Sequence, residues 1–271
     1  MICVTENKGI VSRIIQLTVP SSDDGKKFVR TDRLDLITQA LRKSDYNCLA
    51  DLPLAKVYHH RDFQLGKPSI LVSCHIDSVY SEYFARMQDG ELHGTFDNSA
   101  CNAVLLEAML NDILPAQALV TFTGDEEKKS RGADRTIEFF QMMDIFQTLE
   151  MVITLDLTEE HFDSCKFTIE NHCVEKKNKE SLLKFSKKQD MVDYLSAMIA
   201  SPVFIKNAEP DESWIYREYD LNCFSLCLPC RLLGEDMHDD TGVAIKEDSV
   251  TGYIEALKRL TQAINDDLSS K

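Results

Sequence analysis

The sequence predicts an α/β fold with one central sheet, and three apolar segments of strand length are the main reason. The segments alternate with stretches of helical periodicity, which is typical of a mixed, mostly parallel sheet flanked by helices on both faces. They are Ser69–Cys74, Ala118–Thr123 and Met151–Leu155, and residues with carboxylate or imidazole groups follow each one closely. Ligands bind at the carboxyl ends of strands in an open α/β sheet. The same segments therefore predict both the fold and the place of a site.

Periodicity and turn residues predict the remaining elements. Strand 54–60 is expected to pair with strand 70–72 across a turn at Lys67-Pro68. Asn98 or Ser99 is expected to cap a helix over 100–110, and the Lys/Glu-rich stretch 175–190 is expected to be an exposed loop. The other predicted helices are 31–44, 134–143, 191–200 and 246–264, and the other predicted strands are 166–170 and 222–228.

Composition limits the domain organisation and the partners. The 271 residues are 44% hydrophobic and show no internal repeat, so we expect residues 1–271 to form a single domain. A net charge of -15 argues against nucleic acid and anionic membranes as partners. No apolar run approaches the ~20 residues of a membrane span. Residues 1–6 lack a basic segment followed by a long apolar one, so we expect no signal peptide. Nine cysteines without a small-scaffold spacing indicate reduced thiols in a cytoplasmic protein.

Five positions have the side chains of a two-metal site. They are His75, Asp97, Glu127, Asp156 and His238. Imidazole and carboxylate ligands suit zinc, and also cobalt or manganese. Two divalent ions about 3.5–4 Å apart need a carboxylate between them, and Asp97 is the candidate bridge. Such a centre lowers the pKa of bound water towards ~7 and polarises a carbonyl.

Two further acidic residues adjoin these positions. Asp77 lies two residues after His75, where it can accept the second imidazole N–H and orient the ring. Glu126 precedes Glu127 and would point elsewhere, so it is the candidate general base that moves a proton from water to the leaving amine.

Each residue also has an ordinary explanation. A lone Glu-Glu pair or His-x-Asp is common, Asp97 before Asn98 is compatible with a turn or a helix cap, and His238 stands in an acidic segment typical of a solvated loop. Their common placement at strand ends, in this order, favours a metal site.

Over roughly residues 54–262, the chain resembles the co-catalytic zinc exopeptidase superfamily. The matching motifs are Ser73-Cys74-His75-Ile76-Asp77, Gly94-Thr95-Phe96-Asp97-Asn98, Gly124-Asp125-Glu126-Glu127 with Gly132-Ala133, Leu155-Asp156-Leu157-Thr158 and Met237-His238. Position by position, the resemblance implies that Asp97 bridges two metals held by the other four ligand residues. It implies that Asp77 orients a ligand and that Glu126 is the general base.

The spacing between the candidate ligands limits which branch of this superfamily the chain resembles. His75 and Asp97 are 22 residues apart and Asp156 and His238 are 82 apart, which is too short for the lid or dimerisation domains that some branches insert. The chain thus resembles compact single-domain zinc aminopeptidases. Its local sequence around the motifs is more similar to that of the tetrahedral and glutamyl aminopeptidases. Two segments depart from the pattern: Ala100-Cys101 stands where the family has Gly, and Lys128-Lys129 replaces another Gly-containing segment.

Other features point less clearly to function. Cys223, Cys227 and Cys230 resemble half a zinc knuckle, but buried thiols on a strand are favoured. His161 and His172 are weak candidates for the cleft. Asp211 with Tyr216 or Tyr219 is a weak candidate for binding a substrate amine or a tetrahedral oxyanion.

The sequence therefore favours metal-dependent hydrolysis of an amide bond, most simply as a di-zinc aminopeptidase acting on peptides. A deacylase or amidohydrolase of small N-acyl compounds would use the same site. A non-catalytic metal- or peptide-binding homologue is a third hypothesis, motivated by the two altered segments, and a cysteine-based module is a fourth. A monomer is the default expectation.

Overall fold

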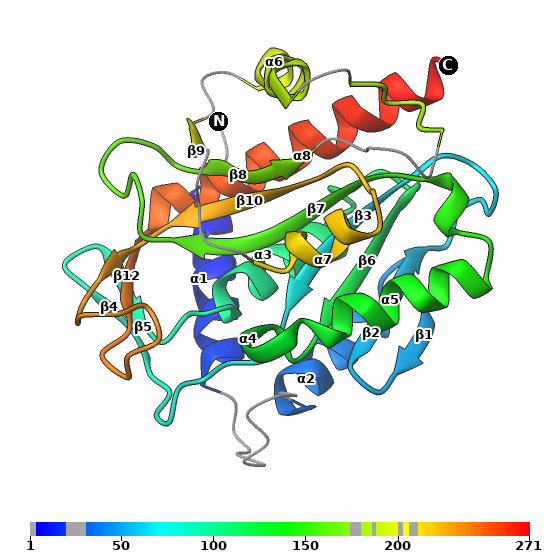
Figure 1. Cartoon of the computed structure of the whole chain (residues 1–271). Helices are drawn as coiled ribbons and strands as arrows, with labels where there is room; N and C mark the ends of the chain where they lie inside the picture. Colours follow the sequence, from blue (N-terminus) through cyan, green and yellow to red (C-terminus); the bar gives the residue numbers. More distant parts are fainter. Residues whose placement is uncertain (1–3, 20–30, 174–179, 186–187, 200–202, 206–210) are drawn as a thin grey trace.

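A computed structural model describes residues 4–19, 31–173, 180–185, 188–199, 203–205 and 211–271. An eight-stranded sheet lies at its centre, with helices on both faces (Figure 1). In spatial order its strands are β1 (Tyr46–Leu52), β2 (Ala55–His60), β6 (Ala118–Thr123), β3 (Ser69–His75), β7 (Leu149–Thr158), β10 (Cys223–Pro229), β8 (Thr168–Cys173) and β9 (Val203–Ile205).

The middle of the sheet is parallel. Strands β6, β3, β7 and β10 run in one direction. Strand β2 pairs antiparallel with β1 and β6, and β8 pairs antiparallel with β10 and parallel with β9. Every residue of β3 and β6 is buried, as expected for strands covered on both faces. The predicted α/β fold is therefore confirmed.

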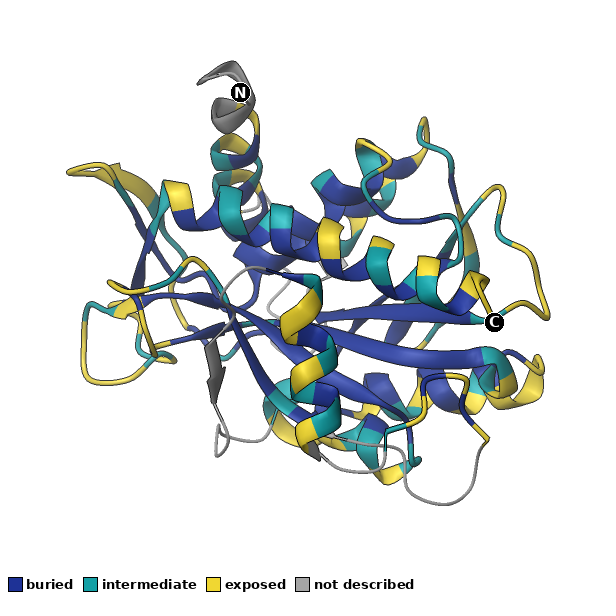
Figure 2. Ribbon diagram, turned by 90° about the horizontal axis from the view of Figure 1, so that it is seen from above, coloured by how far each residue is buried: buried dark blue, intermediate teal, exposed yellow. Residues whose placement is uncertain are grey.

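The helices form one layer on each face of the sheet. They are α1 (Val4–Thr18), α2 (Thr31–Leu41), α3 (Ser99–Leu110), α4 (Glu126–Lys129), α5 (Arg131–Met142), α6 (Lys188–Met198), α7 (Ser213–Glu218) and α8 (Glu247–Ser269), with a 3-10 turn at Phe146–Thr148. Figure 2 shows the central strands of the large sheet in the colour of buried residues, between helices that are exposed on their outer sides.

Two hydrophobic clusters follow from the alternation of side chains along each strand. Val72 and Ile153 face a large cluster that includes residues of α1, α2, α3 and α8. Leu71 and Val152 face a smaller cluster formed with α5 and α7. The second face has room for polar groups beyond its apolar centre, and the candidate site lies at its edge.

The predicted pairing of strand 54–60 with strand 70–72 is wrong. Strand β6 lies between β2 and β3, pairing antiparallel with β2 and parallel with β3. A short connection at Lys67-Pro68 suggested a hairpin, but β3, in which every residue is buried, lies in the middle of the sheet. Its neighbours there, β6 and β7, cover both of its edges.

Other predictions need smaller corrections. Helix α5 begins at Arg131 instead of 134, and strand β8 begins at Thr168 and runs to Cys173. Asn98 does precede α3, but its side chain makes no capping hydrogen bond. Part of the predicted loop 175–190 lies outside the described residues. Within its described part, Ser181 and Leu183 are buried, and α6 already begins at Lys188.

A second, four-stranded sheet was not predicted. Its strands are β11 (Arg231–Leu232), β12 (Val243–Lys246), β5 (Glu91–Gly94) and β4 (Ala85–Gln88). The strands are two to four residues long, too short for a clear alternation of polar and apolar residues. This sheet supports the two loops that carry Asp97 and His238. Among the described helices, none is long and apolar enough to cross a membrane.

Candidate metal centre

Five predicted residues, from segments far apart in the sequence, meet at one edge of the central sheet. His75 is the last residue of β3, Asp156 lies near the end of β7, and Glu127 follows β6 in α4. Parallel pairing aligns His75 at the end of β3 with Thr123 at the end of β6. The carboxyl ends of β3, β6 and β7 therefore lie at the same edge of the sheet. Asp97 comes from the loop between β5 and α3, and His238 comes from the loop between β11 and β12.

The carboxylate of Asp97 stands between the two histidines. Its Oδ1 lies 3.3 Å from Nε2 of His75, and its Oδ2 lies 3.2 Å from Nε2 of His238. Asp156 approaches the same His75 nitrogen at 3.6 Å, and Glu127 approaches the same His238 nitrogen at 3.6 Å. The five residues thus divide into two triplets that share only Asp97.

Asp77 joins the strand to the loop that bears Glu127. Its Oδ1 lies 3.5 Å from Nδ1 of His75, and its Oδ2 accepts the backbone N–H of Glu127 at 3.3 Å. The carboxylate is fully buried. Asp77 therefore lies on the far side of the imidazole from Asp97, where it can orient the ring.

The turn after β6 presents both glutamates to the cleft. Asp125 has a φ of 68°, and its carbonyl accepts the backbone N–H groups of Lys129 at 3.0 Å and Ser130 at 2.7 Å. Arg131 binds the Asp125 carboxylate through two hydrogen bonds of 2.5 and 3.1 Å. Gly132 packs so close to Gly124 that a Cβ added to Gly132 would lie 2.6 Å from the backbone nitrogen of Gly124.

Hydrogen bonds also hold the loop of Asp97. The peptide bond between Asp97 and Asn98 is cis. The Asn98 amide donates to the carbonyl of Leu155 at 2.7 Å, next to Asp156. The Asn102 amide donates to the carbonyl of His75 at 2.6 Å. Both asparagines are fully buried, so they connect the start of α3 to two candidate ligands.

The concentration of carboxylates shifts the protonation of the cluster. Burial raises the pKa of Glu126 to about 9, and the charges of Asp156, Asp97 and Glu127 contribute. Burial likewise raises the pKa of Glu127 to about 7 and that of Asp156 to about 6. These directions show that the protein itself supplies too little positive charge for so many carboxylates.

The pKa values of the two histidines are also raised, but for an imidazole this favours the charged form. The hydrogen bond with Asp97 raises the pKa of His238 to about 9. Burial disfavours the charged form of His75, but contacts with Asp156, Asp77 and Asp97 outweigh it and hold its pKa well above its ordinary value. Burial also opposes the charged form of Asp97, and its contacts with both histidines keep its pKa below the usual range.

The residues fit a pair of divalent cations. Among the described side chains, two candidate ligand oxygens are buried without a hydrogen-bond partner: Oδ1 of Asp97 and Oε1 of Glu127. Ligand atoms of His75, Asp97 and Glu127 all lie within 4.8 Å of one another. Buried carboxylates in excess, with imidazoles between them, are the donors that zinc, cobalt and manganese accept.

A cleft of about 710 Å³ opens over this cluster. Glu126, Lys128, Asp211 and Cys227 line it together with the five candidate ligands. His161 and His172 do not line it.

The structure does not bring Tyr216 and Tyr219 to the cleft. The Tyr216 hydroxyl is buried against Ser73 at 2.8 Å, and that of Tyr219 donates to Asp134 at 3.3 Å. Neither is placed to stabilise an oxyanion.

Two other groups of ligand-type residues are less suited to a metal. Asp45, His60 and Asp112 lie within 4.8 Å of one another, but Asp45 already pairs with Arg61 at 2.9 Å and Asp112 is exposed. Cys223, Cys227 and Cys230 are buried, as predicted for packed thiols. Burial raises the pKa of Cys230 and of Cys227 well above the ordinary value, which disfavours the thiolates that zinc requires.

Comparison with solved structures identifies the fold. The aminopeptidase APDkam598 from the archaeon Desulfurococcus kamchatkensis matches with a TM-score of 0.71 and 11% identity, over 98% of each chain. The aminopeptidase PepT from Bacillus cereus matches with a TM-score of 0.65 and 12% identity, over 98% of this chain and 99% of that one. This chain has the aminopeptidase fold.

The fold alone leaves the chemistry open. An endoglucanase from Thermotoga maritima also matches, with a TM-score of 0.62 and 12% identity, over 95% of this chain and 98% of that one. No protein-family model matches the sequence, and no curated protein matches it. Function must therefore be argued from the site.

Sequence reasoning missed several acidic residues of the cleft. Glu159, Glu160, Glu170, Glu235 and Asp236 line it but have no metal-ligand spacing. The pairs Glu159-Glu160 and Glu235-Asp236 look like ordinary solvated acids in the sequence. Glu170 lies in a short strand, and only the pairing of β8 beside β10 brings it to the site.

Proposed function

We propose that this protein is a metal-dependent peptidase of the aminopeptidase type, with two divalent cations, most simply zinc, at the cluster around Asp97. The observation that carries the proposal is the position of Asp97, whose two oxygens face different histidines at 3.3 and 3.2 Å. One cation would be held by His75, Asp97 and Asp156, and the other by His238, Asp97 and Glu127. A bridging carboxylate reduces the repulsion between two such ions.

The remaining residues have roles that follow from their positions. Bound cations supply a Lewis acid for the scissile carbonyl and lower the pKa of the attacking water. Glu126 lines the cleft beside the ligands, takes a proton from the water and passes it to the leaving amine. Burial, with a smaller contribution from neighbouring carboxylates, raises its pKa to about 9, and nearby cations would lower it. Asp77 holds the orientation of His75.

Hydrolysis of an N-acyl compound by the same residues is the alternative chemistry. Both reactions attack an amide carbonyl with water, so the cluster does not separate them. The acidic cleft favours an amine-bearing peptide over an acyl amino acid with a free carboxylate, because like charges repel across a low-dielectric surface. We therefore place peptides first, and we propose a single catalytic domain without an inserted lid.

Metal content and turnover, measured together, test this function. The purified protein would be reconstituted with zinc, cobalt or manganese, analysed for metal, and assayed on aminoacyl and N-acyl chromogenic substrates. We expect about two ions per chain, turnover of aminoacyl substrates, and a Glu126→Ala variant that keeps its metal but loses activity. Glu138→Gln, on an exposed position of α5, is the matched control.

Each other outcome has a definite meaning. Metal without turnover on any substrate would favour a non-catalytic binding homologue. Turnover of N-acyl substrates alone would favour the deacylase. Absence of metal after reconstitution would refute the proposed centre.

A further inference from the structure

Beyond the candidate ligands, the wall of the cleft carries negative charge with little compensation. Of the described residues that line it, Lys128 is the one lysine or arginine. The carboxylates outside the ligand cluster and Glu126 are Glu159, Glu160, Glu170, Asp211, Glu235 and Asp236. A cleft lined by one sign of charge concentrates ligands of the opposite sign. Two bound dications would compensate the ligand carboxylates but not this second set.

Glu170 is the most informative member of the set. Glu170 is only 5% exposed, the Thr168 hydroxyl donates to its Oε1, and Thr158 also forms a hydrogen bond with its carboxylate. No described lysine, arginine or histidine forms an ion pair with it, and the same holds for Asp211. Burial raises the pKa of Glu170, and the charges of Asp211 and Asp156 raise it further. A buried carboxylate that faces a cleft without a cation is costly unless a ligand supplies one.

Strand register places Glu170 at a defined reach from the metal centre. Asp156 on β7 pairs with Cys227 on β10, and Cys227 pairs with Thr168 on β8. Glu170 is two residues further along β8, where it pairs with Ser225, and it lies on the same face of the sheet. Two strand spacings and this two-residue offset amount to about 12 Å between the Cα atoms of Asp156 and Glu170. A residue bound at Asp156 therefore needs a long side chain to approach the Glu170 carboxylate.

Cys227 of β10 lies between the two ends. Its side chain is buried and lines the cleft. Lysine and arginine place an aliphatic stem against apolar groups and a charged head beyond them. The cleft therefore offers the groups that a long cationic side chain requires, in order: the candidate metal ligands, an apolar contact at Cys227, then a carboxylate without an ion-pair partner among the described residues.

We propose that Glu170, with Asp211 beside it, binds the cationic side chain of the residue whose carbonyl is attacked, so that the preferred substrates begin with lysine or arginine. This inference rests on the proposed peptidase function and deepens it. The carboxylates at the rim, such as Glu159 and Glu235, add attraction over a longer range, which salt screens.

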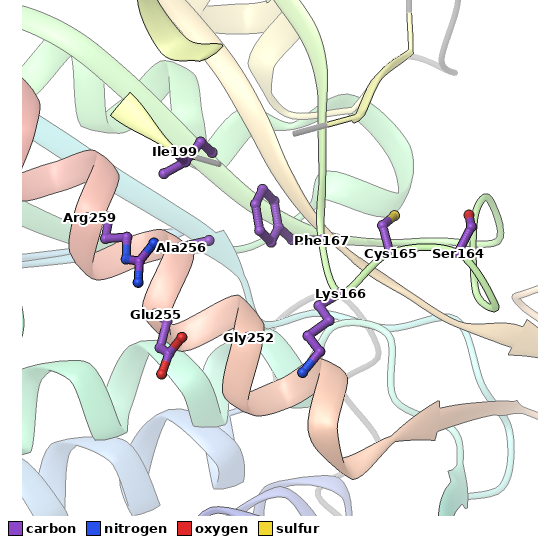
Figure 3. A pocket seen from close by; sticks show the side chains of 9 residues that line it. All are labelled: Ser164, Cys165, Lys166, Phe167, Ile199, Gly252, Glu255, Ala256 and Arg259. Atoms are coloured by element: carbon purple, nitrogen blue, oxygen red, sulfur yellow. The ribbon is translucent and has the colours of Figure 1, made fainter. Parts of the chain in front are cut away.

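Another cavity, between α8 and the segment before β8, offers a contrast. It measures about 260 Å³ (Figure 3). Figure 3 shows Glu255 and Arg259 on α8 and Lys166 across from them. Two cations and one carboxylate line it, so it lacks the negative excess of the cleft. Glu255→Gln is therefore a suitable control for a change in charge away from the site.

The experiment compares substrates that differ only in the charge at the end of the side chain. Lysyl and norleucyl 4-nitroanilides share the α-ammonium group and the aliphatic stem, so they separate side-chain recognition from recognition of the amine. With the metal-loaded protein we expect kcat/KM to favour the lysyl substrate about tenfold or more. Glu170→Gln should remove most of this preference while turnover of the norleucyl substrate persists, and Glu255→Gln should leave the preference intact.

A binding measurement keeps the inference testable without turnover. Lysinamide and norleucinamide would be titrated into the metal-loaded protein by calorimetry at low salt and at high salt. Tighter binding of lysinamide that Glu170→Gln abolishes supports the subsite, even if no substrate is cleaved and the peptidase proposal fails. Equal binding of the two amides, or equal kcat/KM for the two substrates in an active enzyme, would overturn the subsite and leave the peptidase proposal standing.

Discussion

Asp97 and His238 approach each other at 3.2 Å between Oδ2 and Nε2, although they come from loops that lie more than a hundred residues apart in the sequence. Strands β5 and β12, which pair Gly94 with Val243, hold these loops together. The other oxygen of Asp97 faces His75. One carboxylate therefore connects the second sheet to the end of the central sheet, and its two contacts define two separate half-sites.

Substitution of single ligands should resolve these half-sites. We expect His75→Ala and His238→Ala each to retain about one ion per chain, because each leaves one triplet nearly complete. Asp97→Ala should lose most of both ions, since it belongs to both triplets. Elemental analysis of the reconstituted variants measures this. Equal loss in all three variants would contradict the division into two half-sites.

Asp77→Asn should weaken metal binding without removing a ligand. The Asp77 carboxylate lies 3.5 Å from Nδ1 of His75 and also accepts the Glu127 N–H. Loss of an outer carboxylate of this kind costs about 10- to 100-fold in metal affinity or activity. Competition with a chromogenic chelator would measure the change. An affinity equal to that of the wild type would show that His75 is oriented by other contacts.

The stability of the metal-free protein should fall as pH rises from about 6 to 9. Glu126 and His238 have folded-state pKa values of about 9, and Glu127 of about 7. All lie above the values in an unfolded chain, so the folded state binds more protons in this range and loses stability as they dissociate. Thermal unfolding in a chelating buffer measures this.

Bound metal should reverse this trend. Metal replaces protons at the ligands, so its binding strengthens as pH rises. In the metal-free protein, the fall in Tm with pH should be smaller for Glu126→Gln, because this variant removes one group with a raised pKa. A metal-free wild-type Tm that rises steadily from pH 6 to 9 would contradict the raised pKa values given to Glu126, Glu127 and His238.

Gly132→Ala should destabilise the protein by about 1–3 kcal/mol. A Cβ there would lie 2.5 Å from the Leu54 carbonyl oxygen and 2.6 Å from the Gly124 nitrogen. Neither backbone atom can move without disturbing the turn that carries Glu126 and Glu127. Gly9→Ala is the control, because nothing lies within 4 Å of its Cβ position in α1 and alanine favours a helix by up to about 1 kcal/mol. Denaturant unfolding should show opposite signs for the two variants.

The buried strands of the fold were predictable because their signal is local. Ser69–Cys74 and Ala118–Thr123 are continuous apolar runs, and all their residues are buried in the structure. The candidate ligands were predictable because three of them lie at or just beyond the ends of such runs. The strand order was not predictable, since β2 and β3 are consecutive in the chain but separated by β6 in the sheet.

The sequence by itself determined which residues are candidates for the chemistry and which segments form the core, because residue type and apolar periodicity are properties of the chain. Tertiary structure alone decided that Asp97 stands between His75 and His238, and that Glu170 reaches the cleft two strands from Asp156. Both relationships depend on which strands become neighbours. That choice is made by burial of whole sheet faces, which no local pattern encodes.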